Sequence, residues 1–185
     1  EIGVRLVGSE MCIRDRCVNL RNAIAEKERV GADNVICSNG AAEMIFAVVR
    51  AVMPKKTLLL APTFSEYERA LKSVGSQICY YYLKEENDFE LQDDFIDNLD
   101  DIDMVFICNP NNPVGKIADK KTAQHIAEVC GEREIVCVLD ECFMDLADGY
   151  SMKEKVPVIK AFTKTYAMAG SVSYTHLTLP TTSRV

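Results

Sequence analysis

Histidine is scarce in this chain of 185 residues, which contains only His125 and His176. None of the eight cysteines belongs to a CxxC pair. Zinc sites are built from sets of histidine and cysteine ligands at short spacings, so we expect no metal site. Two glycine-rich phosphate-binding patterns, GxGxxG and GxxxxGK[ST], are also missing. The sequence therefore argues against a zinc enzyme and against a typical nucleotide-binding protein.

The chain has no cluster of basic residues and no long hydrophobic run. Lys and Arg number 21 against 28 Asp and Glu, which gives a net charge of −7. This balance argues against a nucleic-acid or membrane partner. No apolar stretch approaches the roughly 20 residues of a membrane-spanning helix, and no signal peptide is recognisable. We therefore expect a cytoplasmic protein whose cysteines pack as small hydrophobic side chains.

The two ends of the chain differ in character from the rest. Residues 1–16, ending in VGSEMCIRDR, and residues 171–185, SVSYTHLTLPTTSRV, show no helical or strand periodicity. Both segments resemble translated sequencing adapters, and we interpret them as non-native sequence. Residues 17–170 remain, and we expect them to form one incomplete domain.

The hydrophobic pattern of residues 17–170 alternates between strands and helices. The predicted strands are 35–37, 57–61, 77–83, 104–108, 135–139 and 156–162. The predicted helices are 20–29, 39–53, 65–73 and 120–130, the second with Ser38 or Asn39 as its N-cap. Continuous apolar strands that alternate with amphipathic helices indicate an α/β fold with a mostly parallel sheet covered on both faces.

Ligands of such sheets bind beyond the carboxyl ends of the strands. The segments expected at that edge are SNGAA, PTF, NPNNPVG, DEC and FTK. Asp140 and Glu141 follow an apolar strand, where a carboxylate is costly unless it is paired. Solvated acids at a strand end are the alternative.

Two further features of this edge have both a functional and an ordinary explanation. The small residues after Asn39 leave helix N–H groups accessible to a phosphate, although a plain capped helix start has the same pattern. Lys164 follows an apolar strand and precedes small residues; in a partly desolvated pocket its amine could form a Schiff base, whereas most lysines are solvated charges.

Five motifs together resemble a known family. They are GAAE, APTFSEYERAL, CNPNNPVGK, LDECFMDL and AFTKTYAMAG, in this order. They are similar to the large domain of fold-type-I pyridoxal-phosphate enzymes, in the aminotransferase class I and II group. The branch that they resemble contains threonine-phosphate decarboxylases and histidinol-phosphate aminotransferases. This resemblance implies a three-layer α/β/α domain, pyridoxal 5'-phosphate as cofactor and a homodimeric parent protein.

The resemblance also assigns roles to individual residues. Lys164 would carry the cofactor and Asp140 would pair with its pyridine nitrogen, so these two are the expected catalytic residues. Asn112 would hydrogen-bond the ring hydroxyl and Phe64 would stack on the ring. The phosphate would be held by Ala41, Ala42 and Thr163.

Two residues of the expected site bear on the choice of branch. Aminotransferases of this group typically have Tyr at the position of Phe143 and Ser at that of Thr163, and the motifs as a whole are most similar to the decarboxylases. The resemblance thus implies decarboxylation of threonine phosphate in cobalamin biosynthesis. An aminotransferase and a non-catalytic binding module are the alternatives. The family's small C-terminal domain and its substrate-binding arginine have no counterpart here, so we expect the chain as written to be inactive.

Overall fold

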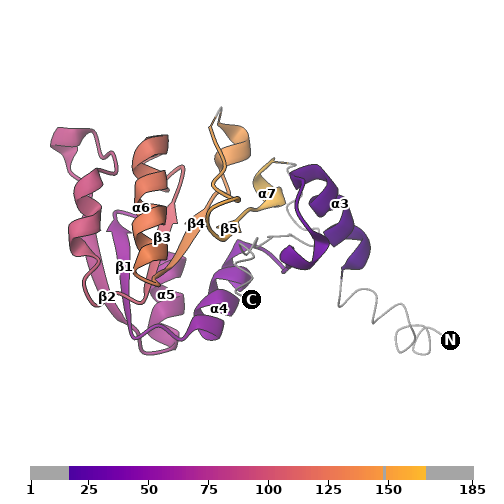
Figure 1. Ribbon diagram of the computed structural model, residues 1–185, viewed down its shortest axis with the longest axis horizontal. Coiled ribbons are helices and arrows are strands. Elements are labelled where there is room, and N and C mark those ends of the chain that lie inside the picture. The colour runs from indigo at the N-terminus through magenta and orange to yellow at the C-terminus, as the bar shows by residue number, and fades with distance from the viewer. Residues whose placement is uncertain (1–16, 148, 166–185) are drawn as a thin grey trace.

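The computed structural model describes residues 17–147 and 149–165. Within them, one five-stranded sheet has the order β2-β1-β3-β4-β5 (Figure 1), and every neighbouring pair of strands is parallel. The strands are β1 (Lys56–Ala61), β2 (Gln77–Tyr82), β3 (Met104–Cys108), β4 (Val136–Asp140) and β5 (Val158–Ile159). The carboxyl ends of all these strands consequently meet at one edge of the sheet.

Helices connect the strands and cover the sheet. The α-helices are α3 (Val18–Glu28), α4 (Ala41–Val52), α5 (Ser65–Ser73), α6 (Lys120–Glu132) and the short α7 (Phe162–Thr165). Four 3₁₀ segments are also described: η1 (Ala32–Asn34), η2 (Glu85–Asn87), η3 (Asp93–Asn98) and η4 (Met144–Leu146).

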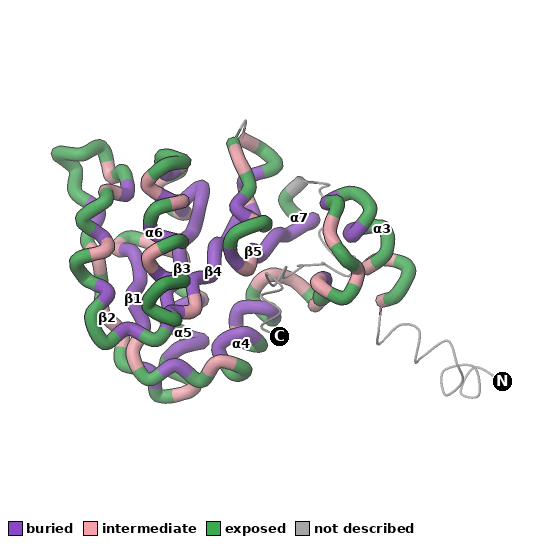
Figure 2. Tube along the Cα trace, viewed as in Figure 1, coloured by how far each residue is buried: buried purple, intermediate pink, exposed green. Residues whose placement is uncertain are grey.

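The inner strands of the sheet, β1, β3 and β4, are buried on both faces (Figure 2), whereas the edge strand β2 is partly exposed. In β3 all five residues are buried, and they alternate between the two layers. Val105 and Ile107 pack with α6 and η3, while Met104 and Phe106 pack with α4 and α5. Side chains along a strand point alternately to opposite faces, so a strand covered on both sides needs a continuous apolar run. The three-layer α/β/α fold expected from the sequence is confirmed.

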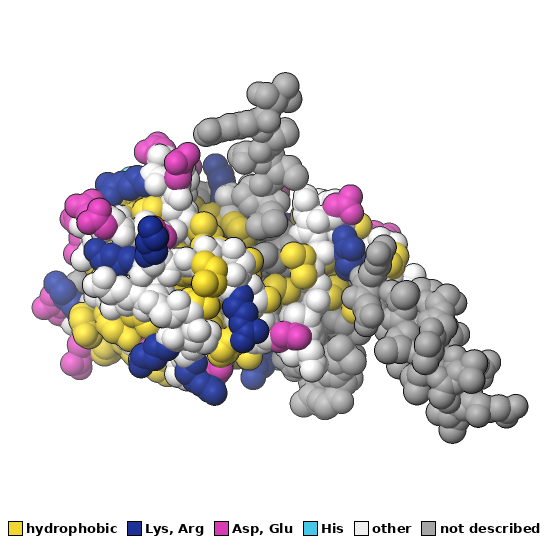
Figure 3. All heavy atoms as spheres, turned by 90° about the horizontal axis from the view of Figure 1, so that it is seen from below, with side chains coloured by type: hydrophobic (Ala, Val, Ile, Leu, Met, Phe, Trp, Pro, Cys, Tyr) yellow, Lys and Arg dark blue, Asp and Glu magenta, His cyan; other side chains and the backbone are white. Residues whose placement is uncertain are grey.

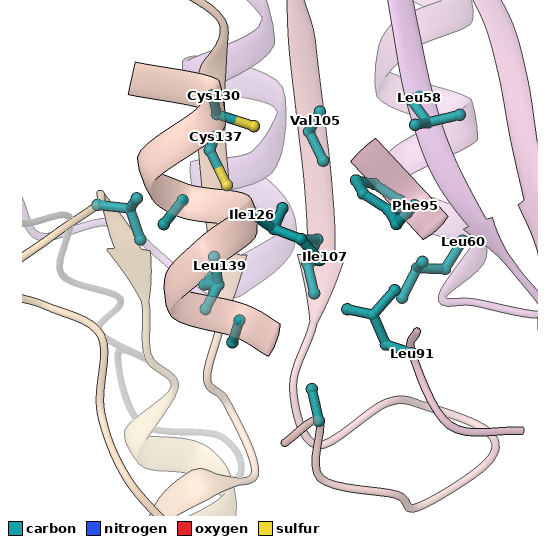
Figure 4. Packing of buried hydrophobic residues seen from close by; sticks show 14 of the residues in the cluster. Leu58, Leu60, Leu91, Phe95, Val105, Ile107, Ile126, Cys130, Cys137 and Leu139 are labelled. Carbon is teal, nitrogen blue, oxygen red and sulfur yellow. The ribbon is translucent and has the colours of Figure 1, made fainter. Parts of the chain in front are cut away.

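The cysteines contribute to this core. Of the seven described cysteines, four are buried: Cys108, Cys130, Cys137 and Cys142. Cys130 of α6 and Cys137 of β4 lie in the same hydrophobic layer, next to Ile126 (Figure 4). Cysteine in such a layer packs as a small hydrophobic residue, as the sequence suggests.

Two predicted strands differ from the structure. Residues 35–37 are extended but pair with no strand among the described residues, and Val35 is instead buried against α3. The strand predicted at 156–162 is reduced to Val158–Ile159, because the chain turns after Ile159 and Phe162 begins α7. Pro157 also precedes the strand, where its missing N–H cannot extend the ladder.

Helix α6 begins at a side-chain cap that positions it on the sheet. The carboxylate of Asp119 accepts hydrogen bonds from the backbone N–H groups of Lys121 at 2.9 Å and Thr122 at 3.1 Å. Replacing Asp119 with alanine leaves these donors without that partner. We expect the free energy of unfolding to fall by about 1 kcal/mol, measured by chemical denaturation. Asp119→Asn, which keeps a capping oxygen, is the matched control and should remain close to wild type.

The surface of the described part mixes charges of both signs. On the face shown in Figure 3, Lys and Arg side chains are interspersed with Asp and Glu side chains. None of the described helices has the length and apolar character needed to cross a bilayer.

Candidate active site

A cavity of about 240 Å³ lies at the carboxyl edge of the sheet. It is lined by Gly40, Ala41, Ala42, Phe64, Cys108, Asn112, Asp140, Cys142, Phe143, Ala161 and Lys164. Six of the seven residues assigned above to cofactor binding are in this set. The seventh, Thr163, has its backbone in α7, and its side chain lies outside the described part of the structure. Segments spread over most of the domain thus converge on one cavity.

One wall of the cavity is the start of helix α4. The N-cap is Gly40, with φ 94°, and no side chain caps the helix. Ser38 and Asn39, the two expected caps, make other contacts. The Ser38 hydroxyl donates to the Gly40 carbonyl, and the backbone N–H of Asn39 donates to the Glu43 carboxylate. Helix N–H groups therefore lie beside the cavity under residues with minimal side chains, which suits an anionic group. The sequence prediction of a Ser38 or Asn39 cap was wrong, because Gly40 is the N-cap and no side chain caps the helix.

Asp140, the last residue of β4, is 3% exposed at the floor of this cavity. Its Oδ1 accepts the Cys142 N–H at 3.0 Å, and its Oδ2 accepts the Tyr67 hydroxyl at 2.6 Å. Burial, and then the nearby Asp140 carboxylate, raise the pKa of Tyr67 well above its ordinary value, so Tyr67 stays a donor. Two fixed donors thus hold a buried carboxylate with a defined orientation.

Tyr67 is a site residue that the sequence reasoning missed. It is fully buried on α5, its ring stacks on Phe106 at 5.0 Å between centroids, and it meets the Phe64 ring edge-on at 5.7 Å. One side chain therefore contacts both the carboxylate and the aromatic wall of the cavity. Its place three residues after Phe64, on the apolar side of a predicted helix, was the available signal, but this pattern is equally typical of an ordinary core residue.

The loop after β3 brings Asn112 to the cavity. Asn109 is fully buried, and its Oδ1 accepts the Ala118 N–H at 2.9 Å. Asn111 donates from its Nδ2 to the carbonyl of Pro62 at 3.0 Å, which joins this loop to the one after β1. Two of the three asparagines therefore fix the loop, and the third, Asn112, faces the cavity.

Lys164 also lines this cavity, with its Nζ 5.7 Å from the centroid of the Phe143 ring. The other nucleophiles of the cavity are thiols. Burial raises the pKa of Cys108 to about 12, and burial together with Asp140 raises the pKa of Cys142 well above its ordinary value. Both thiols are therefore protonated at neutral pH. Among the described lining residues, Lys164 has the primary amine that can form a Schiff base with an aldehyde.

Glu141 is not among the residues that line the cavity. It is 1% exposed, and it accepts the Met152 N–H and the Ser151 hydroxyl, each at 2.7 Å. Burial raises its pKa, and these two hydrogen bonds oppose the rise. The two adjacent acids have thus separated roles: Asp140 faces the cavity, and Glu141 holds the loop that contains Ser151 and Met152.

Comparison with known proteins agrees with this geometry. The chain is 33% identical over 160 residues to the threonine-phosphate decarboxylase of Salmonella typhimurium, an alignment that covers 82% of this chain and 44% of that protein. It is 29% identical to the histidinol-phosphate aminotransferase of Methanococcus aeolicus, over 74% of this chain and 39% of that protein. The chain thus spans less than half the length of these curated relatives.

A solved structure gives the same result at the level of fold. The histidinol-phosphate aminotransferase of Clostridium acetobutylicum superposes with a TM-score of 0.80 and 26% identity, covering 96% of this chain and 54% of that one. Residues 15–177 match the sequence profile of the family described as aminotransferase class I and II, whose members depend on pyridoxal phosphate. The chain therefore belongs to the aminotransferase class I and II family of pyridoxal-phosphate enzymes.

Proposed function

We propose that the protein to which this chain belongs is a carboxy-lyase that acts on threonine phosphate, with pyridoxal phosphate held in the 240 Å³ cavity. The chemistry of the lining supports this cofactor. An uncapped helix start suits its phosphate, the buried Asp140 carboxylate suits a protonated ring nitrogen, and Lys164 suits its aldehyde. When bound, the cofactor supplies an electron sink for a bond that breaks at the substrate α-carbon.

Each proposed role follows from a position in the cavity. Asp140 keeps a proton on the ring nitrogen, because a buried carboxylate with two fixed donors favours a cation beside it. Phe64, braced edge-on by Tyr67, provides an apolar face for the ring, and the Asn112 amide provides a hydrogen bond for the ring hydroxyl. Ala41 and Ala42 offer backbone N–H groups to the phosphate, and the Thr163 hydroxyl is proposed as a further donor there.

Lys164 has two tasks in this proposal. Its amine would hold the aldehyde carbon of a bound cofactor, and it would serve as the proton-transferring group once the substrate amine occupies that carbon. In the lyase reaction the bond from the α-carbon to the carboxylate breaks, carbon dioxide leaves, and the Lys164 ammonium returns a proton to the α-carbon. In an aminotransferase the same amine would instead remove the α-proton.

The observation that carries the choice of lyase is Phe143. Its ring lines the cavity beside Asn112 and Asp140 and has no hydroxyl to donate, at a position where the related aminotransferases typically carry Tyr. The higher identity to the decarboxylase of Salmonella typhimurium, 33% against 29% for the Methanococcus aeolicus aminotransferase, favours the same choice. The aminotransferase is nevertheless the second candidate, because its likeness in sequence and fold covers most of the described domain.

The discriminating experiment uses the full-length protein loaded with cofactor. It is incubated with threonine phosphate or with histidinol phosphate, each with and without 2-oxoglutarate. We expect carbon dioxide release from threonine phosphate that does not depend on 2-oxoglutarate. Glutamate formation without carbon dioxide release would establish the aminotransferase instead, and no reaction with either substrate would favour a binding protein.

Two further properties are proposed with this function. A homodimer is expected, and its mass in solution can be measured by light scattering. A cytoplasmic location is consistent with the substrate class and can be checked by cell fractionation.

A further inference from the structure

A network of four charged side chains, two of them buried, lies next to the segment that carries Lys164. The side chains of Lys160 and Glu28 are each only 7% exposed. Lys160 Nζ lies 3.1 Å from Asp145 Oδ1 and 3.5 Å from Glu28 Oε1. Lys153 Nζ completes the network at 2.8 Å from Glu28 Oε2, and it also donates to the Glu28 carbonyl at 2.7 Å. Two cations and two carboxylates thus alternate.

The network joins segments that are far apart in the sequence. Glu28 is the last residue of α3, and Asp145 is in η4, five residues after Asp140. Lys160 lies between β5 and α7, four residues before Lys164. Figure 1 shows α3 and α7 side by side, and Phe162 of α7 packs in a hydrophobic cluster with Ile24 of α3. The segment after β5 is therefore attached directly to α3, and η4, which follows β4, is attached to α3 through Lys160.

The charges in this network depend on one another. Burial lowers the pKa of Lys160, but the carboxylates of Glu28 and Asp145 raise it by more, so that it lies above its ordinary value. Lys160 therefore stays protonated and cannot attack a carbonyl carbon. Lys164, in contrast, forms no ion pair with a carboxylate of the described residues, and its Nζ lies over the Phe143 ring. The two neighbouring lysines thus have opposite environments.

We propose that Lys160 is a positioning residue that holds Lys164 at the cavity. Its ion pairs to Glu28 and Asp145 fasten the turn between β5 and α7 to α3 and to η4, so the backbone that carries Lys164 has one position. The same ion pairs keep Lys160 charged and direct the cofactor to Lys164. This inference rests on the proposed role of Lys164, whereas the fastening of α3 and α7 can be measured without it.

The test compares three variants of the full-length protein with bound cofactor. Lys160→Met removes the charge and Lys160→Arg keeps it. Lys155→Met is the matched control, because Lys155 is 51% exposed and pairs only at 3.5 Å with Glu128 on the surface. Hydrogen exchange of backbone amides is the first readout. Lys160→Met should accelerate exchange in both α3 and α7 by about tenfold or more, while Lys160→Arg and Lys155→Met stay near wild type.

The pH titration of the visible absorbance of the bound cofactor is the second readout. Removing a buried positive charge favours the protonated form of the Lys164 nitrogen that is joined to the cofactor. The midpoint should therefore move to higher pH in Lys160→Met, by about one unit, and return in Lys160→Arg. If Lys160 had only a structural role, Lys160→Met would accelerate amide exchange in α3 and α7 but leave the midpoint of the cofactor absorbance unchanged. An unchanged midpoint would therefore overturn the proposal.

Two other outcomes are also decisive. If Lys160→Met does not fold, Glu28→Gln weakens the contacts of Lys160 and Lys153 with α3 and leaves the Lys160–Asp145 pair in place. The proposal then requires faster exchange in α3 together with a midpoint that moves to lower pH, because a negative charge has been removed. Wild-type behaviour of these variants in a protein that binds cofactor would contradict the positioning role. A failure of the proposed function is distinguishable. If the protein is an aminotransferase, the wild type still shows cofactor absorbance and both readouts apply, whereas a wild type without cofactor absorbance contradicts the role of Lys164 and leaves the exchange of α3 and α7 measurable.

Discussion

Replacing Lys164 with alanine is expected to abolish carbon dioxide release from threonine phosphate, with a loss of at least about 10³-fold. In the proposed function, the amine of Lys164 both binds the cofactor and moves the proton at the α-carbon. The other nucleophiles of the cavity, Cys108 and Cys142, are protonated thiols because burial raises the pKa of each. We expect no other described side chain to replace Lys164. The measurement is the initial rate in the full-length protein saturated with cofactor.

The covalent site itself is tested by borohydride reduction and peptide mapping. The label should appear on Lys164 in wild type and disappear in Lys164→Ala. Lys72→Ala, which alters an exposed lysine paired with Glu68 on α5, is the control and should keep full labelling. A label on Lys160 would refute both the Lys164 assignment and the positioning role of Lys160.

Replacing Asp140 with asparagine is expected to lower the same rate by about 10² to 10⁴-fold. Asparagine keeps the shape of the side chain but removes the charge that faces the ring nitrogen. Leaving a buried cation without its partner costs about 3–5 kcal/mol, which corresponds to a rate change of that size if the charge is needed in the transition state. The substrate should still bind, so the loss should appear in kcat more than in KM.

Stability measurements separate this effect from unfolding. In the cofactor-free protein Asp140 is a buried carboxylate held by the Tyr67 hydroxyl and the Cys142 N–H. Removing its charge relieves a desolvation cost, so Asp140→Asn should unfold at a temperature close to that of wild type. Tyr67→Phe is the companion variant: it removes one charge-assisted hydrogen bond and should lower the rate by about 10 to 100-fold. A large rate loss in Tyr67→Phe with none in Asp140→Asn would contradict the assigned roles.

The layer architecture was available from the sequence because it depends on local patterns. Continuous apolar runs such as 104–108 predicted strands buried on both faces, and helix α5 was placed at residues 65–73 in both the prediction and the structure. The strand predicted at 35–37 was wrong, because a strand also needs a partner, and no described segment pairs with it. A short run of apolar residues cannot show whether such a partner exists.

Some residues of the candidate site were indicated by the sequence, and others were found only in the tertiary structure. Strand-end position placed Asp140 and Lys164 among the candidate residues, since parallel strands end at one edge of a sheet, and the resemblance of the motifs assigned their roles. Tyr67 and Lys160 were not assigned to the site, because their sequence neighbours give no sign that one meets Asp140 and the other is buried between Glu28 and Asp145.

The sequence by itself therefore determined which classes of protein are disfavoured, through its few histidines, its missing glycine-rich patterns and its acidic charge balance. The order of five motifs indicated the family. The tertiary structure decided which of the remaining polar groups act together. Asp140 is oriented by a tyrosine from another layer of the fold, and Lys160 is kept charged by carboxylates from two distant segments. Electrostatic effects depend on distance in space and on burial, and neither quantity is a property of position along the chain.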